Sequence, residues 1–166
     1  MGTGPTLGAY GAAVTIDARL AELGIELPTP SSPAGDYVGA VRTGDLLFLS
    51  GAGPVRADGS VITGKVGGTV DLPAAVEAAR VTGLQLLATA RRELGSLDAV
   101  RRVVKTFGMV NCAPGFNRTP QVIDGCSDVL VEIFGDAGRH TRSAVGLAEL
   151  PFDIAVEIEL TAKLKR

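Results

Sequence analysis

The sequence TRSAVGLAELP (residues 141–151), followed by FDIAVEIELTAKL (residues 152–164), decides how this chain folds. In residues 156–161, apolar side chains alternate with Glu157, Glu159 and a threonine, which predicts a strand with one buried face, because successive side chains in a strand point to opposite faces. Arg142 stands among small and apolar residues ahead of the Leu150-Pro151 break, and we expect it to begin the first strand of a hairpin. An arginine on one strand and carboxylates on the next could form a small site for an anionic substrate, whereas two half-exposed strands with ordinary surface charges explain the same pattern.

Two helices are predicted upstream of this stretch. The first runs from Leu72 to Leu94, where Asp71 can cap its start and Gly95 can end it. Its small and apolar residues recur at helical spacing, so this face should pack closely on a sheet. The second runs from Pro120 to Phe134 and carries Cys126 on its apolar face, where a cysteine is expected to act as a small buried hydrophobe.

Three further strands and a short helix complete the pattern. The helix is expected at Ile16 to Leu23, and the strands at Tyr37 to Arg42, Asp45 to Ser50 and Asp98 to Val110. Residues 46–49 are continuously apolar, which predicts a central strand that is covered on both faces. The resulting order is strand, strand, helix, strand, helix, strand, strand, and it predicts an α+β fold with a mixed sheet and two helices on one face.

The second face of that sheet has no helix to cover it. A large exposed apolar face marks an assembly surface, so we expect a homo-oligomer. Residues 1–14 are rich in Gly and Ala without a pattern and are expected to form a loose tail, which leaves residues 15–166 as a single domain.

Composition and charge argue against several classes of protein. The 166-residue chain has 46% hydrophobic residues, ample for a core, and a net charge of −2 without a basic block, which argues against nucleic-acid binding led by phosphate contacts. No stretch approaches the ~20 apolar residues of a membrane helix, and the first residues lack the pattern of a secretion signal. Cys112 and Cys126 are therefore expected to be free thiols in a reducing cytoplasm, and with the single histidine, His140, they do not make a metal site.

The motifs of this chain, taken in order, resemble those of one known family. Arg142-Ser143, Leu150-Pro151 and the strand that begins at Val156 resemble the C-terminal signature of the RidA (YjgF/YER057c/UK114) family. Tyr37-Val38, with Ser50-Gly51 thirteen positions after the tyrosine, resembles its N-terminal signature. The middle segment, from Asn111 to Gly135, is similar to one longer branch of the family, and the resemblance as a whole covers about residues 15–165.

This resemblance implies a chorismate-mutase-like fold of the bacillus type, assembled as a homotrimer with ligand clefts between subunits. It implies hydrolysis of reactive 2-imino and 2-aminoacrylate intermediates to 2-keto acids and ammonia, with no cofactor. By position, Arg142 would bind the carboxylate of a small metabolite through two hydrogen bonds, a task suited to its planar fork. Glu157 would be the catalytic residue that orients or activates water. Tyr37, Ser50 and Gly51 would line the cleft.

The sequence departs from the family pattern in three places. Ala144, at a substrate-binding position, stands where deaminating members carry a cysteine, which puts substrate choice in question more than reaction type. Ala52 replaces the glutamine that often follows the Ser-Gly pair. The long middle segment has no close counterpart in the deaminating branch, so Asn111, Phe116 and Ser127 are candidates for contacting a different ligand, or are simply structural.

Two other functions remain open at this point. A protein that binds a small carboxylate without turnover would carry the same residues. An RNA-directed role, as an endoribonuclease or translation inhibitor, is disfavoured by the net acidity and by the lack of a surface that combines aromatic and basic residues. Glu159 lies on the same predicted strand face as Glu157 and could do the same job, or either carboxylate could be a solvated partner for a lysine.

Overall fold

The fold is built around one five-stranded sheet, seen in a computed structural model that describes residues 14–166. The predicted tail therefore lies outside the described residues, except for Val14. The strands are β1 (Ala40–Thr43), β2 (Leu46–Ala52), β3 (Val100–Asn111), β4 (Thr141–Leu147) and β5 (Val156–Leu164). Their order across the sheet is β1-β2-β5-β3-β4, and every neighbouring pair is antiparallel except β3 and β4. The mixed α+β sheet predicted from the sequence is confirmed.

The predicted hairpin between the last two strands is wrong. β4 pairs in parallel with β3, and β5 pairs antiparallel with the other edge of β3. The long strand β3 therefore lies between them, and the chain passes over its end through the short 3-10 helix η3 (Pro151–Asp153). A parallel neighbour needs a crossover rather than a tight turn, and β3 has its crossover to β4 in the helix between them.

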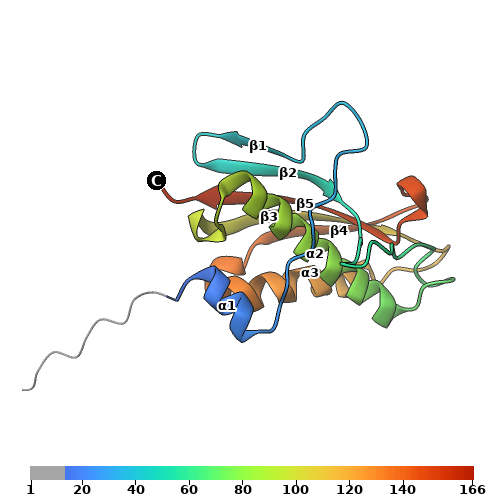
Figure 1. Cartoon of the computed structure of the whole chain (residues 1–166). Helices are drawn as coiled ribbons and strands as arrows, with labels where there is room; N and C mark the ends of the chain where they lie inside the picture. The colour runs from blue at the N-terminus through green and yellow to red at the C-terminus, as the bar shows by residue number, and fades with distance from the viewer. Residues whose placement is uncertain (1–13) are drawn as a thin grey trace, which may run out of the picture.

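Three α-helices and three 3-10 turns accompany the sheet. The helices are α1 (Ile16–Glu22), α2 (Leu72–Leu94) and α3 (Thr119–Phe134), and the other two 3-10 turns are η1 (Leu97–Ala99) and η2 (Gly135–Gly138). The predicted Asp71 cap is confirmed, because its side chain accepts a hydrogen bond from the Ala74 N–H in the first turn of α2. The Thr15 side chain caps α1 in the same way, by accepting from the Ala18 N–H. α2 and α3 lie on the same side of the sheet, with α1 beyond them (Figure 1). No helix within residues 14–166 is long and apolar enough to cross a membrane.

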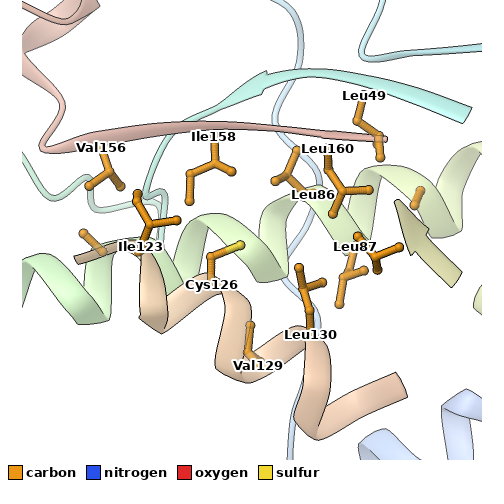
Figure 2. Packing of buried hydrophobic residues seen from close by; sticks show 14 of the residues in the cluster. Leu49, Leu86, Leu87, Ile123, Cys126, Val129, Leu130, Val156, Ile158 and Leu160 are labelled. Atoms are coloured by element: carbon orange, nitrogen blue, oxygen red, sulfur yellow. The ribbon is translucent and has the colours of Figure 1, made fainter. Parts of the chain in front are cut away.

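The core fills the space between the sheet and the two long helices. Val156, Ile158 and Leu160 of β5 point toward α2 and α3 (Figure 2). The small residues of the predicted α2 face, which we expected to pack on the sheet, include Gly83. This residue instead faces α3, where a Cβ would lie 3.1 Å from the Cys126 sulfur. Cys126 is fully buried, and burial raises its pKa to about 12, which confirms its interpretation as a small hydrophobe.

The face of the sheet opposite the helices is open in the single chain. Leu47 and Leu49 of β2 are buried against the helices, but Phe48 between them is 45% exposed on the open face. The prediction that residues 46–49 form a central strand covered on both faces is therefore wrong for the isolated chain: β2 is second from the edge. Val41, directly opposite Phe48 on β1, is also exposed, so an apolar patch lies where the predicted assembly would form, and the homotrimer stays a prediction.

Candidate functional site

A hollow of about 320 Å³ opens beside the end of β2, and we call it the Glu157 hollow. Its walls bring together Tyr37, Ser50, Gly51 and Glu157, four residues that are far apart in the sequence. The volume lies at the lower end of the range usual for small-molecule sites. The sequence therefore predicted one coherent group of residues at this place.

The polar groups in the hollow are oriented by local backbone contacts. The Ser50 hydroxyl donates to the Val38 carbonyl at 2.7 Å, which leaves its lone pairs available to accept a hydrogen bond. The Tyr37 hydroxyl oxygen accepts the Ala34 N–H at 3.2 Å, so its own proton remains available to donate. Gly51 is required by close approach, because a Cβ there would collide with a carboxylate oxygen of Glu157.

Glu157 is the acid of this hollow. Its side chain is half-buried on β5 and has no hydrogen-bond partner among residues 14–166. Burial, and to a lesser degree the neighbouring Glu159 carboxylate, raises the pKa of Glu157. A carboxylate that holds a proton more readily than usual is suited to exchange one with a substrate or a water molecule.

Arg142 lies elsewhere, on the edge strand β4, and we call its surroundings the Arg142 edge. Its Nη1 donates to Asp124 Oδ1 at 2.8 Å and to Ser127 Oγ at 3.0 Å, both on α3. The Nε and Nη2 atoms donate to no residue within 14–166. One nitrogen therefore fixes the guanidinium, while the edge formed by Nε and Nη2 keeps the two parallel donors that match a carboxylate.

His140 completes the network around Arg142. Its Nδ1 lies 2.6 Å from the Gly138 carbonyl and must donate to it, so Nε2 accepts from the Ser127 hydroxyl at 3.2 Å. Burial, together with the nearby Arg142 charge, lowers the pKa of His140 and favours this neutral form. Within residues 14–166, no three His, Cys, Asp or Glu side chains are grouped closely enough to hold a metal ion.

The Glu157 and Arg142 side chains point to opposite faces of the sheet within one chain. Arg142 pairs with Thr106 of β3, whose side chain is buried on the helix side. Glu157 pairs with Met109 of β3, three positions further along, and therefore points to the open face. Strand β3 also separates them, so the two cannot contact one ligand in the same chain.

Residues 17–164 match the family described as "YjgF/chorismate mutase-like, putative endoribonuclease". The chain belongs to the YjgF family. This match covers the Glu157 hollow and the Arg142 edge alike, and it agrees with the family that the motifs resemble.

Individual YjgF relatives agree along most of the chain. "Protein TCP17" of Trypanosoma cruzi is 40% identical over 150 residues, which are 90% of this chain and 94% of the relative. The crystal structure of a protein of unknown function from Agrobacterium tumefaciens is 38% identical, with a TM-score of 0.83, and covers 90% of this chain and 92% of its own. A structure named as a putative endoribonuclease from Shewanella oneidensis is 29% identical, with a TM-score of 0.87, over 90% of this chain and 99% of its own.

The other predicted site residues of this YjgF family member lie outside the hollow. The Ala144 carbonyl accepts a hydrogen bond from the Thr119 hydroxyl at 3.0 Å. Asn111 is fully buried and has side-chain hydrogen bonds on both its amide atoms. Phe116 packs against Gly67, where it leaves no room for a Cβ. Of the middle-segment candidates, only Ser127 touches a predicted ligand-binding residue.

Sequence reasoning missed two residues that hold Arg142 in place. Asp124 precedes Ser127 by three positions on α3, so the two share a helix face. That spacing was a usable signal, but it pointed to Arg142 only if α3 was known to lie beside β4. His140 was considered only as a metal ligand, although it lies two residues from Arg142.

Proposed function

We propose that the protein binds a small carboxylate metabolite between copies of the chain and hydrolyses its imine to a 2-keto acid and ammonia. The observation that carries this proposal is the state of Arg142. One of its nitrogens is held by Asp124 and Ser127, and its bidentate edge is unused within residues 14–166. A guanidinium prepared in this way is suited to receive a carboxylate without reorganising.

Glu157 supplies the proton chemistry in this proposal. Its carboxylate accepts a hydrogen bond from water and takes one proton as the water oxygen bonds to the iminium carbon, which gives a neutral carbinolamine. Protonated Glu157 then returns that proton to the amino group, the C–N bond breaks, and ammonia leaves as the carbonyl forms. The hydroxyl proton passes to the departing ammonia, so one iminium ion and one water yield one keto acid and one ammonium ion.

Tyr37 and Ser50 would assist this step from the wall of the hollow. The free Tyr37 hydroxyl proton can be donated to the substrate, and the Ser50 lone pairs can accept from the iminium N–H. Charge that develops on the reacting atoms then meets fixed dipoles rather than mobile water. Since an iminium carbon is already electrophilic, such positioning supplies much of the rate increase.

The separation of Arg142 from Glu157 supports a cleft between two copies. The Arg142 edge of one chain would close over the Glu157 hollow of another, and a closed ring of such contacts is the predicted homotrimer. The exposed apolar residues of the open face, Val41 and Phe48, would be covered in the same assembly. Each cleft would then contain one group from each of two subunits.

The direct test is ammonia release from 2-iminobutyrate or 2-iminopropionate generated in solution. The wild type should accelerate release over buffer, and Arg142→Ala should lower kcat/KM by at least about 100-fold, because a charged hydrogen-bonded contact to the substrate is removed. Arg139→Ala is the matched control, since Arg139 is a nearby arginine whose side chain is 71% exposed. No acceleration by wild type, or equal rates in the two variants, would contradict the proposal.

Two other functions are distinguished from this one by further observations. Calorimetry that detects 2-ketobutyrate binding dependent on Arg142, without any turnover of the imine, would indicate a carboxylate-binding protein. Endoribonuclease activity, suggested by the name of the Shewanella structure, has less support in this chain. Two neighbouring arginines of α2, Arg91 and Arg92, form ion pairs with Asp17 and Glu93 and are not free to contact a phosphate backbone.

A further inference from the structure

Phe152 projects into solvent at the rim of the Glu157 hollow. It is 82% exposed, more than any other large apolar residue of the described chain, and it lines the hollow together with Val55, Val61 and Ile154. The core does not require this ring, and its position adds aromatic surface to a wall that is already aliphatic. An exposed aromatic ring beside a hollow is typical of a surface that contacts a ligand.

The backbone that carries this ring is in an unfavourable conformation. Phe152 has φ 56° and ψ 20°, and Asp153 has φ 56°, both in the left-handed region that favours glycine. Such a conformation costs about 1–2 kcal/mol for each L-residue, so the surroundings must hold it. The Gly64 N–H does so in part, since it donates to the Asp153 carbonyl at 2.7 Å.

Asn111 braces this turn from the sheet. Its Nδ2 donates to Asp153 Oδ1 at 2.9 Å, and its Oδ1 accepts from Lys65 Nζ at 2.8 Å. Lys65 Nζ also donates to the Ala148 carbonyl and to Glu149 Oε2, the latter at 3.0 Å. Asn111 is fully buried, so this network links the last residue of β3 to the loops on either side of Phe152. The ring is therefore carried by a braced turn rather than by a loose loop.

We propose that the hollow selects metabolites with a large apolar side chain, aromatic or branched, and that Phe152 is the residue that sets this preference. The inference rests on the proposed function, since it assumes that Arg142 of another copy binds the carboxylate of the same molecule. The side chain would lie against Phe152, Val61 and Ile154, while the reacting carbon stays beside Glu157. Imines of alanine or 2-aminobutyrate would leave this apolar wall in contact with water.

The experiment compares the affinities of pyruvate and phenylpyruvate, the stable keto acids of a small and a large substrate, by calorimetry. Wild type should bind phenylpyruvate at least about tenfold more tightly, because the phenyl group is removed from water. Phe152→Asn should bring the ratio close to one, since asparagine accepts the left-handed conformation but carries no ring. Phe152→Leu should keep part of the preference. Val14→Ala, at an apolar residue that is 72% exposed and does not line the hollow, should keep all of it.

The outcomes separate this inference from the proposed function. Equal affinity for the two keto acids in wild type, with both lost in Arg142→Ala, overturns the inference and leaves the proposed function intact. If neither keto acid depends on Arg142, the proposed function fails, and the neutral probe 3-phenylpropanamide tests the hollow alone. Amide binding that is kept in Arg142→Ala and lost in Phe152→Asn supports the inference, whereas amide binding that is absent or unchanged overturns it.

A second variant protects the test against an effect on folding or assembly. Val61 lines the same hollow and is 42% exposed, so Val61→Ala removes apolar surface without touching the strained turn. It should reduce the phenylpyruvate to pyruvate ratio by a smaller factor than Phe152→Asn. Size-exclusion elution equal to that of wild type is required of each variant. An unchanged ratio in a Val61→Ala protein that elutes normally counts against the inference.

Discussion

The Glu157 hollow and the Arg142 edge carry opposite charges and are prepared in opposite ways. Glu157 has no hydrogen-bond partner within residues 14–166, and its raised pKa makes it ready to exchange a proton. The Arg142 Nη1 donates to Asp124 Oδ1 at 2.8 Å and to Ser127 Oγ at 3.0 Å, and these two hydrogen bonds hold the guanidinium in one position. Glu157 is suited to proton transfer and Arg142 to positioning, and the two side chains point to opposite faces of the same sheet. The difference indicates that neither region is a complete site.

Among single substitutions in the two regions, removing the carboxylate of Glu157 should have the largest effect on turnover. Glu157→Gln should lower kcat by about 100-fold or more, because general acid–base catalysis by a positioned side chain contributes at least that much. The affinity for 2-ketobutyrate should change little, because the carboxylate of the ligand is bound by Arg142. Ammonia release and calorimetry on the same preparation measure the two quantities. Turnover equal to wild type would remove Glu157 from the mechanism.

Glu157→Gln should also change the melting temperature, in a direction that follows from the raised pKa of Glu157. The folded pKa of Glu157 is raised, so the folded chain holds this proton more tightly than the unfolded chain, and ionisation opposes folding as pH rises through the raised pKa. Glu157→Gln should therefore melt at a higher temperature than wild type at pH 7. The difference should vanish below the ordinary glutamate value of 4.5. Thermal melts at the two pH values check this without any substrate.

Mixing two inactive variants tests whether the two regions meet between copies. Arg142→Ala and Glu157→Gln chains, unfolded and refolded together in equal amounts, should recover about a quarter of wild-type activity, since each cleft draws its two groups independently from two subunits. Each variant refolded alone should stay inactive. If one chain supplied both groups to a site, the mixture would contain no intact site and would show no recovery.

The sequence predicted the helix side of the molecule well because local signals agree there. The bounds of α2 follow from the Asp71 cap and from Gly95, which has φ 77° and ends the helix. The alternation in β5 correctly assigned Val156 and Ile158 to the core and Glu157 to the other face. These features depend on residues a few positions apart, which a single sequence records directly.

The arrangement across the sheet was harder to predict because it depends on pairings between distant residues. β4 and β5 are close in sequence, yet β3 inserts between them, and no local pattern distinguishes this order from a hairpin. The roles of Asp124 and Asn111 have the same origin, since each contacts a residue from another element. Residues of the hollow were found by motif, whereas the network that holds Arg142 required knowing that α3 lies beside β4.

The smallest expected effect concerns Glu159, which lies on the same strand face as Glu157. Burial is the main cause of the raised Glu157 pKa, and the Glu159 charge is the lesser one. Glu159→Gln should therefore move the acid limb of the pH profile of kcat/KM to a lower pH without abolishing the limb, because Glu157 would stay half-buried. The plateau at higher pH should be unchanged, since Glu157 is ionised there in both proteins.

Two comparisons show whether that shift arises from the charge of Glu159. Glu26→Gln makes the same change in net charge at an exposed residue that does not line the hollow, so it should leave the acid limb where it is. At about 1 M salt, wild type and Glu159→Gln should converge, because charges exposed to solvent are screened within about 3 Å. Glu159 is exposed and Glu157 is half-buried, so salt should reduce the coupling between them and leave the burial effect in place. An acid limb that is the same in wild type and in Glu159→Gln at low salt would assign the whole rise in pKa to burial.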